Sequence, residues 1–234
     1  MSDPFVKVTR DGGVSVLHMD DGKANALSPQ MITELSAALD EAEKQGDAVV
    51  LAGREGRFSA GFDLKVMMTS VEAAKTLVRS GGELLLRLYM FPRPVVIACT
   101  GHALAGGALL VLIGDHRVAA RGPFRIGLNE VSIGMPLPIL GQELARDRLT
   151  SAELPRATLF AHIYDPETAL AAGYLDATAA PDELLSTAKA EAARLGALST
   201  TAYAATKQRL RERTVQYIRD TLDRDMAQLA PPTG

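Results

Sequence analysis

The sequence is short of cysteine, of excess positive charge and of long apolar runs, and each shortage excludes a class of protein. Its 234 residues contain one cysteine, Cys99, which has no disulfide partner within the chain and indicates a reducing compartment. The net charge of −3, with no basic stretch interleaved with aromatic residues, argues against nucleic-acid binding. The longest apolar run, 103–113, is too short to span a bilayer, and residues 1–20 lack the pattern of a signal peptide. We therefore expect a soluble, cytoplasmic protein with no nucleic-acid or membrane partner.

Several familiar types of site are also missing. Gly101 and Gly106 have the spacing of a phosphate-binding loop, but Gly107 and Ala108 stand where that loop needs Lys and then Ser or Thr. No G-x-G-x-x-G sequence follows a predicted strand, and no G-x-S-x-G surrounds Ser59. We predict no metal site, because no cysteine or carboxylate stands at ligand spacing from the histidines, which are His18, His102, His116 and His162.

The patterns that are present predict an α/β fold. Hydrophobic residues make up 47% and charged residues 23% of the chain, which is typical of a globular domain with a sizeable core. A turn over 11–13 predicts a hairpin of strands 5–10 and 14–19, and the apolar runs 48–52 and 95–99 predict buried strands. Ser28-Pro29 begins a predicted helix that Gly46 ends, and a second helix over 71–90 is expected to break or kink at Gly81-Gly82. Strand and helix thus alternate, as in α/β proteins.

Helices dominate the second half of the predicted fold. They are expected over 139–149, 151–161, from Asp165 to Gly173, over 182–195 and over 202–229. The last one keeps apolar residues after one of its faces is filled, which favours a contact between subunits.

Three residues suggest a site that binds an oxyanion and moves a proton. Gly106 begins a helix whose first amides have no acceptor inside the helix, although close packing explains the Gly106-Gly107 pair equally well. Small residues before Phe62 let its backbone amide face a ligand beside that of Gly106, but an ordinary loop in which Asp63 caps the next helix also explains them. Glu130 has apolar neighbours in the sequence, and burial among them would raise its pKa and suit it as a proton carrier, whereas most glutamates are solvated.

Four segments together resemble the crotonase (enoyl-CoA hydratase/isomerase) family, and they follow the family's order: 23–27, 58–64, 101–109 and 127–134. The resemblance implies a spiral of ββα units over residues 1–187, a helical oligomerisation region over 188–234, and a homotrimer or a dimer of trimers. It also implies an acyl-CoA thioester substrate, so that CoA arrives with the substrate and no separate cofactor is needed. The amides of Phe62 and Gly106 would bind the thioester oxygen as it becomes an enolate, with Glu130 as the acid/base.

One position departs from the hydratases of the family, which activate water between two glutamates. The second of those glutamates matches Glu130, but Leu109 stands where the first would fall. A single glutamate beside an apolar wall suits moving a proton within the substrate, and the pattern looks closest to the Δ3,Δ2-enoyl-CoA isomerase branch, which acts in fatty-acid β-oxidation. The alternatives are hydration, thioester hydrolysis or decarboxylation at the same site, or a crotonase-like protein that only binds a partner.

The resemblance also implies where the substrate lies. By position, the groups expected to contact CoA or the acyl chain are Lys23, Ala24, Ala26, Ala60, Asp63, Leu64 and Leu109. Lys207 resembles a lysine whose ammonium meets a CoA phosphate, often across a subunit boundary, and a solvated helix lysine is the alternative. The chain is shorter than is usual for the family around 67–71 and at its C-terminus, where the acyl pocket and the trimer contacts form.

Overall fold

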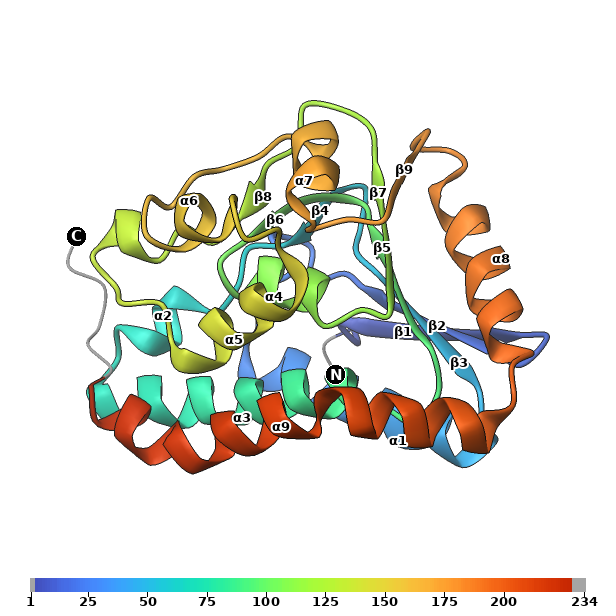
Figure 1. Cartoon of the computed structure of the whole chain (residues 1–234), viewed down its shortest axis with the longest axis horizontal. Helices are drawn as coiled ribbons and strands as arrows, with labels where there is room; N and C mark the ends of the chain where they lie inside the picture. Colours follow the sequence, from blue (N-terminus) through green and yellow to red (C-terminus); the bar gives the residue numbers. More distant parts are fainter. Residues whose placement is uncertain (1–2, 229–234) are drawn as a thin grey trace.

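Two β-sheets organise the chain in the computed structural model, which describes residues 3–228 (Figure 1). The larger sheet has the strand order β1-β2-β3-β5-β7-β9; β1 and β2 pair antiparallel, and the other neighbours pair in parallel. Its strands are β1 (Val6–Asp11), β2 (Val14–Met19), β3 (Ala48–Ala52), β5 (Val95–Cys99), β7 (His116–Ala120) and β9 (Ala177–Ala179). The smaller sheet is parallel and consists of β4 (Gly56–Ser59), β6 (Gly101–Leu104) and β8 (Ile126–Gly127).

After the hairpin of β1 and β2, three turns of the chain each add one strand to each sheet and then a helical segment. The pair β3 and β4 is followed by α2 (Leu64–Met67) and α3 (Val71–Tyr89), and the pair β5 and β6 by α4 (Gly106–Leu112). The pair β7 and β8 is followed by the 3₁₀ turn η1 (Val131–Ile133) and α5 (Ile139–Arg148). The predicted α/β fold, a spiral of ββα units, is therefore confirmed.

The central strands are buried along their whole length, as their uninterrupted apolar runs predict. On β3, Val49 and Leu51 face the main core, whereas Val50 faces a second, smaller cluster on the other side of the sheet. Because successive side chains of a strand point to opposite faces, a strand that is covered on both sides favours apolar residues at every position. These strands hold the loops at their carboxyl ends in fixed places.

Local signals set most helix ends where the sequence predicts them. Ser28 begins α1 (Pro29–Gln45) by accepting a hydrogen bond from the amide of Met31 at 3.2 Å, and Gly46 ends it in the left-handed conformation, at φ 71°. The helix predicted over 151–161 is reduced to α6 (Leu154–Thr158), because Pro155 fits the first turn of a helix but not its interior. α7 (Pro166–Ala172) begins at its Asp165 cap as predicted.

The predicted break in α3 is wrong. The helix runs without interruption from Val71 to Tyr89, and both Gly81 and Gly82 lie on its buried side. Glycine costs a helix about 1 kcal/mol relative to alanine but does not by itself end it. What requires a glycine at position 81 is a contact made by a distant residue, described below.

The carboxyl-terminal helices cover two different surfaces. α8 (Leu184–Gly196) packs on the face of the larger sheet opposite the main core, with Leu184, Ala188 and Ala192 buried. The predicted boundary between residues 187 and 188 falls inside this helix, and the division of the chain into a spiral core and an oligomerisation region stays a prediction. α9 (Thr200–Ala227) runs along α3 and α5 at one edge of the molecule (Figure 1). Its predicted end at residue 229 lies outside the described residues.

Candidate active site

A small cavity lies where α2, α3, α4 and the segment after β8 meet. Its volume is about 170 Å³. Among the described residues that line it, Glu130 is the one ionisable side chain and Asn129 is polar. The rest of the lining is formed by Ala60, Phe62, Leu64, Met67, Val78, Leu104, Ala105, Leu109, Ile133, Met135 and Pro138. The cavity thus presents one acid/base group to an apolar ligand.

Glu130 is a buried carboxyl group, not a solvated one. It stands at the start of η1, and its backbone carbonyl accepts hydrogen bonds from the amides of Ile133 and Met135, both at 3.0 Å. Glu130 is 7% exposed, and its Oε2 atom has no hydrogen-bond partner among the described residues. Burial raises the pKa of this carboxyl group to about 7. Glu130 can therefore both take up and return a proton near neutral pH.

The backbone next to Phe62 lies against the amide of Gly106. Gly61 has φ +87°, and a Cβ atom built on it would lie 2.7 Å from the Gly106 nitrogen. In residues 3–228, no hydrogen bond uses the N–H of Phe62 or of Gly106. Ala105, which precedes Gly106 and also lines the cavity, has φ +49°, a conformation that strains any residue except glycine. Two unused donors on neighbouring backbone segments are what an oxyanion hole requires.

The glycine pair at the start of α4 serves two purposes. A Cβ atom on Gly107 would lie 2.1 Å from the Ser59 carbonyl oxygen, so this glycine is required for close packing of α4 on β4. Gly106 instead places its amide beside Gly61. Asp63 caps α2 by accepting a hydrogen bond from the Lys65 amide at 2.9 Å, so the capping interpretation of this loop is also correct. At the start of α4 and in the loop before α2, a structural role for one residue therefore leaves the amide of its neighbour available to a ligand.

Leu109 forms part of the apolar wall of the cavity that holds Glu130. It lies on α4, one turn after Gly106, and is 2% exposed. A leucine has no proton to donate and no lone pair to orient water. The position at which a second carboxylate is expected in hydratases is therefore inert here.

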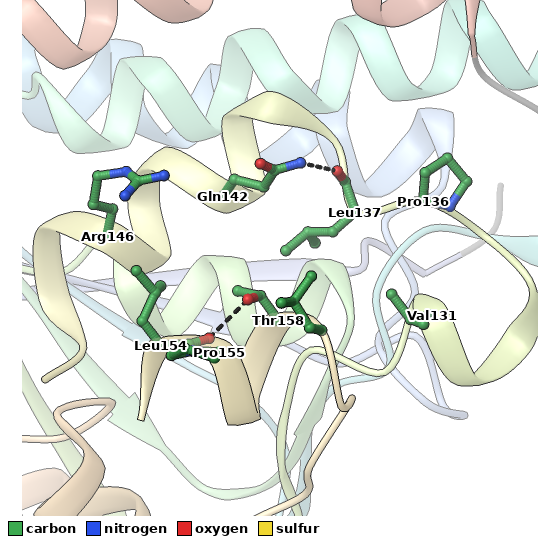
Figure 2. Close-up of a pocket in the computed structure, with 9 residues that line it drawn as sticks. Val131, Pro136, Leu137, Gln142, Arg146, Leu154, Pro155 and Thr158 are labelled. Carbon is green, nitrogen blue, oxygen red and sulfur yellow. Dashed lines mark hydrogen bonds between the residues drawn. The ribbon is translucent and has the colours of Figure 1, made fainter. Parts of the chain in front are cut away.

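A second, wider groove lies on the surface between α5 and α6, and Figure 2 shows the side chains that line it. Its volume is about 440 Å³, and Val131, Pro136 and Leu137 of the segment that follows Glu130 form one wall. Two of its polar side chains are occupied: Gln142 donates to the Leu137 carbonyl and Thr158 to the Leu154 carbonyl. The groove lacks a buried acid/base group among its described residues, so we place the chemistry in the smaller cavity.

Phe62 is held by the glycine in the middle of α3. A Cβ atom on Gly81 would lie 2.3 Å from the ring carbon Cε1 of Phe62, whereas one on Gly82 would meet Leu140 at an ordinary 3.5 Å.

We therefore expect Gly82→Ala to raise stability by about 0.5–1 kcal/mol, because alanine is the better helix former. Gly81→Ala should lower stability and displace Phe62. Thermal melts and turnover of the two variants check this, and equal effects on both would contradict it.

The loop predicted to contact CoA is fastened to the end of β4. Ala60 donates its amide to the Ala24 carbonyl at 3.0 Å, and Ser59 Oγ donates to the Asn25 carbonyl at 2.7 Å. Asn25 is fully buried in the left-handed conformation, and its Nδ2 donates to the carbonyl of Phe58 at 3.2 Å. Sequence reasoning missed Asn25 and Ser59 as residues that shape this loop, although Asn is a residue that commonly adopts this conformation.

The structure places three of the predicted substrate contacts, Ala60, Leu64 and Leu109, in the lining of the cavity. Ala60 and Leu64 are exposed at the edge of the cavity, and Lys23 is exposed on the loop that packs beside Ala60. Ala24 and Ala26 belong to the same loop, and Asp63 caps α2 next to Leu64.

Lys207 does not belong to this group, and both interpretations of it need correction. It is 7% exposed, and its ammonium donates to Asp115 Oδ2 at 2.6 Å and to the Phe91 carbonyl at 2.8 Å. Burial lowers the pKa of Lys207 to about 8, against the opposing effect of Asp115. A buried, paired ammonium is neither solvated nor free to meet a CoA phosphate.

Two further predictions can be compared with the described part of the chain. Residues 3–228 contain no group of three or more histidine, cysteine or carboxylate side chains placed to hold a metal ion. In the same range, every helix is too short or too polar to cross a membrane.

The fold and the site together define an acyl-thioester enzyme of the crotonase type. A ββα spiral places an apolar cavity with one buried carboxyl group next to two adjacent backbone segments whose Phe62 and Gly106 amides are free of hydrogen bonds in residues 3–228. The family model for enoyl-CoA hydratase/isomerase matches residues 9–229. The chain belongs to this family.

Relatives of both catalytic types resemble this chain. A structure of an enoyl-CoA isomerase from Mycobacterium tuberculosis is 44% identical, with a TM-score of 0.93 over 98% of this chain and 100% of that one. Human mitochondrial Δ3-Δ2-enoyl-CoA isomerase is 31% identical, with a TM-score of 0.91 over 95% of this chain and 89% of that one. A probable enoyl-CoA hydratase of Mycobacterium avium is 35% identical over 191 residues, which are 80% of this chain and 73% of that protein.

Proposed function

We propose that this chain is a Δ3,Δ2-enoyl-CoA isomerase. The observation that carries the proposal is that Glu130 is the one ionisable side chain among the described residues of the cavity and shares it with Leu109. Hydration needs a group that orients and activates water in addition to a proton donor. Isomerisation needs one base that later acts as the acid, and the pKa of Glu130, raised to about 7, suits both tasks.

The reaction proceeds in two proton transfers. In a 3-enoyl-CoA, the Glu130 carboxylate removes a proton from C2, and the electrons move onto the thioester oxygen to form a dienolate. The amides of Phe62 and Gly106 donate to this oxygen, where negative charge develops. The resulting Glu130 carboxylic acid then returns the proton to C4, the double bond settles between C2 and C3, and the enzyme is regenerated. No water is consumed.

A hydratase is the second candidate, and Asn129 is the observation that favours it. Its Oδ1 atom is buried without a hydrogen-bond partner among the described residues, and the side chain lines the cavity beside Glu130. An amide oxygen accepts a hydrogen bond from water. It cannot take a proton from that water, which is why we rank hydration second.

Two substrates and one substitution distinguish the two reactions. The protein should convert 3-hexenoyl-CoA to the conjugated 2-enoyl thioester, seen as a rise in enone absorbance, and should leave the absorbance of crotonyl-CoA nearly unchanged. Leu109→Glu should hydrate crotonyl-CoA at least tenfold faster than the wild type, because it supplies the second carboxyl group that hydration uses. It should isomerise more slowly, because a neighbouring carboxylate raises the pKa of Glu130 and leaves less of it as the base.

Leu109→Gln is the matched control for this substitution. It has the shape of glutamate but no acid, so it should gain no hydratase activity. If the wild type hydrates crotonyl-CoA as fast as it isomerises 3-hexenoyl-CoA, the chain is a hydratase. If it does neither while still binding acyl-CoA, the non-catalytic alternative holds.

The CoA contacts and the oligomer stay proposals. We propose that the loop of Lys23, Ala24 and Ala26, with Ala60, Asp63 and Leu64, receives the CoA part of the substrate. A homotrimer or a dimer of trimers fits the exposure of large apolar side chains on α9 and near α6, where Leu210 is 75% and Phe160 is 71% exposed. Sedimentation velocity should give three or six times the mass of the chain.

A further inference from the structure

The carboxyl end of α4 is held by an arginine from another helix. Arg148 is the last residue of α5, and its Nε donates to the Leu112 carbonyl at 3.1 Å while its Nη2 donates to the Gly114 carbonyl at 2.7 Å. These carbonyls lie at the end of α4, where helix carbonyls have no partner inside the helix and carry partial negative charge. Burial, and to a smaller extent the positive charge of Arg211, lower the pKa of Arg148 to about 10. Arg148 therefore remains a cation at neutral pH.

Two cations of α9 bind Asp115, the residue that follows Gly114. Lys207 donates to Asp115 at 2.6 Å, and Arg211 donates to the same carboxylate at 2.8 Å. Asp115 in turn accepts the amide of Val95 at 2.8 Å, at the start of β5. Residues 112–115 are thus tied at once to α5, α9 and the central sheet, through groups that are mostly buried.

This connection acts on a short, fully buried helix whose amino end carries the Gly106 amide. The helix has seven residues, or about 10 Å, between the Gly106 amide and the Arg148 contacts. Its cap residue, Ala105, provides no side-chain hydrogen bond and has a strained backbone at φ +49°. A short helix behaves as a rigid rod, so a shift at its carboxyl end is transmitted to the amide at its amino end.

We propose that Arg148 is a positioning residue for catalysis, which holds α4 by its carboxyl end and thereby keeps the Gly106 amide aimed at the thioester oxygen. The proposal rests on the proposed function, in which that amide is one of the two oxyanion donors. Lys207 and Arg211 support the same end of α4 through Asp115.

The test measures hydrogen bonding to the substrate as well as turnover. Bound 2-hexenoyl-CoA with a ¹³C-labelled thioester carbonyl reports donation to its oxygen as a fall in the carbonyl stretching frequency. In Arg148→Met, this frequency should return toward the solution value, and kcat for 3-hexenoyl-CoA should fall at least tenfold with KM changed by less than about twofold. Arg148→Lys keeps the charge but cannot bridge both carbonyls in the same geometry, so it should recover part of both effects.

Arg93→Met is the matched control. Arg93 likewise donates to a carbonyl at the carboxyl end of a helix, that of Gly196 in α8 at 3.0 Å, but α8 carries no part of the site. This variant should keep the wild-type frequency and kcat. If Arg148→Met folds and keeps both, or if Arg93→Met loses as much, the positioning role is wrong.

The same measurements test the oxyanion site separately from the role of Arg148. If the wild type shows no fall in carbonyl frequency on binding, the proposed oxyanion site itself is wrong, whatever Arg148 does. If Arg148→Met does not fold, Arg148→Lys decides: a normal frequency and normal kcat in that variant would overturn the proposal, and a partial loss of both would support it.

Discussion

Glu130→Gln is expected to lower isomerisation of 3-hexenoyl-CoA by about 10³–10⁴-fold while leaving acyl-CoA binding intact. Glutamine keeps the size of the side chain but cannot accept a proton from C2 or return one to C4, and general acid/base groups typically contribute factors of this order. In the wild type, kcat/KM should fall about tenfold per pH unit below pH 7, because burial raises the pKa of Glu130 to about 7 and the reaction begins from the carboxylate.

The same substitution should change stability in a way that depends on pH. The pKa of Glu130 is about 7 in the folded protein against an ordinary 4.5, so the carboxyl group favours folding below pH 4.5 and this stabilisation is lost as the pH rises to 7. The difference amounts to about 3 kcal/mol. Glu130→Gln escapes this loss, so at pH 8 it should melt at a higher temperature than the wild type, with the advantage shrinking toward pH 4.

Glu212→Gln provides the control for both effects, since Glu212 is exposed on α9. Turnover and melting temperature of this variant should follow the wild type at every pH. Full turnover in Glu130→Gln would remove Glu130 from the mechanism. A gain in stability that does not depend on pH would contradict the burial of an ionisable group at this position.

Gly61→Ala is expected to lower kcat by about 10²–10³-fold, which is the usual effect of losing one oxyanion donor. The added Cβ atom would lie 2.7 Å from the Gly106 nitrogen and 3.0 Å from the Leu104 carbonyl oxygen, so it must push α4 and the Phe62 segment apart. The substitution also forces an alanine to φ +87°, which costs stability on its own. The kinetic effect must therefore be separated from the effect on folding.

Gly46→Ala separates the two effects. Gly46 has φ +71°, and a Cβ atom there meets nothing within 4 Å, so this variant carries a similar backbone strain without the clash. Gly46→Ala should lose about 1–3 kcal/mol of stability from backbone strain, and Gly61→Ala should lose more because of its clash. Only Gly61→Ala should lose turnover. Equal kcat in the two variants would mean that the Gly106 amide takes no part in the reaction.

Much of the fold follows from short-range patterns, and these are where sequence reasoning succeeds. Ser28 and Gly46 bound α1 because a side-chain oxygen and a left-handed glycine satisfy the free ends of a helix within a few residues. The apolar runs of β3 and β5 specify buried strands for the same reason, since period and polarity are properties of neighbouring residues. Errors arise where a distant contact decides, as at Gly81, where the glycine makes room for Phe62 and the helix does not break.

In the candidate site too, some features follow from the sequence and others depend on long-range packing. By itself, the sequence determined that Glu130 stands among apolar residues, that Leu109 occupies the place of a second acid, and that the amides of Phe62 and Gly106 are candidates for an oxyanion hole. Only the tertiary structure decided that Gly61 lies against Gly106 and that the Lys207 ammonium is buried on Asp115, far along the chain. A sequence shows which side chain stands at each position, but burial and hydrogen bonding depend on which distant segments pack there.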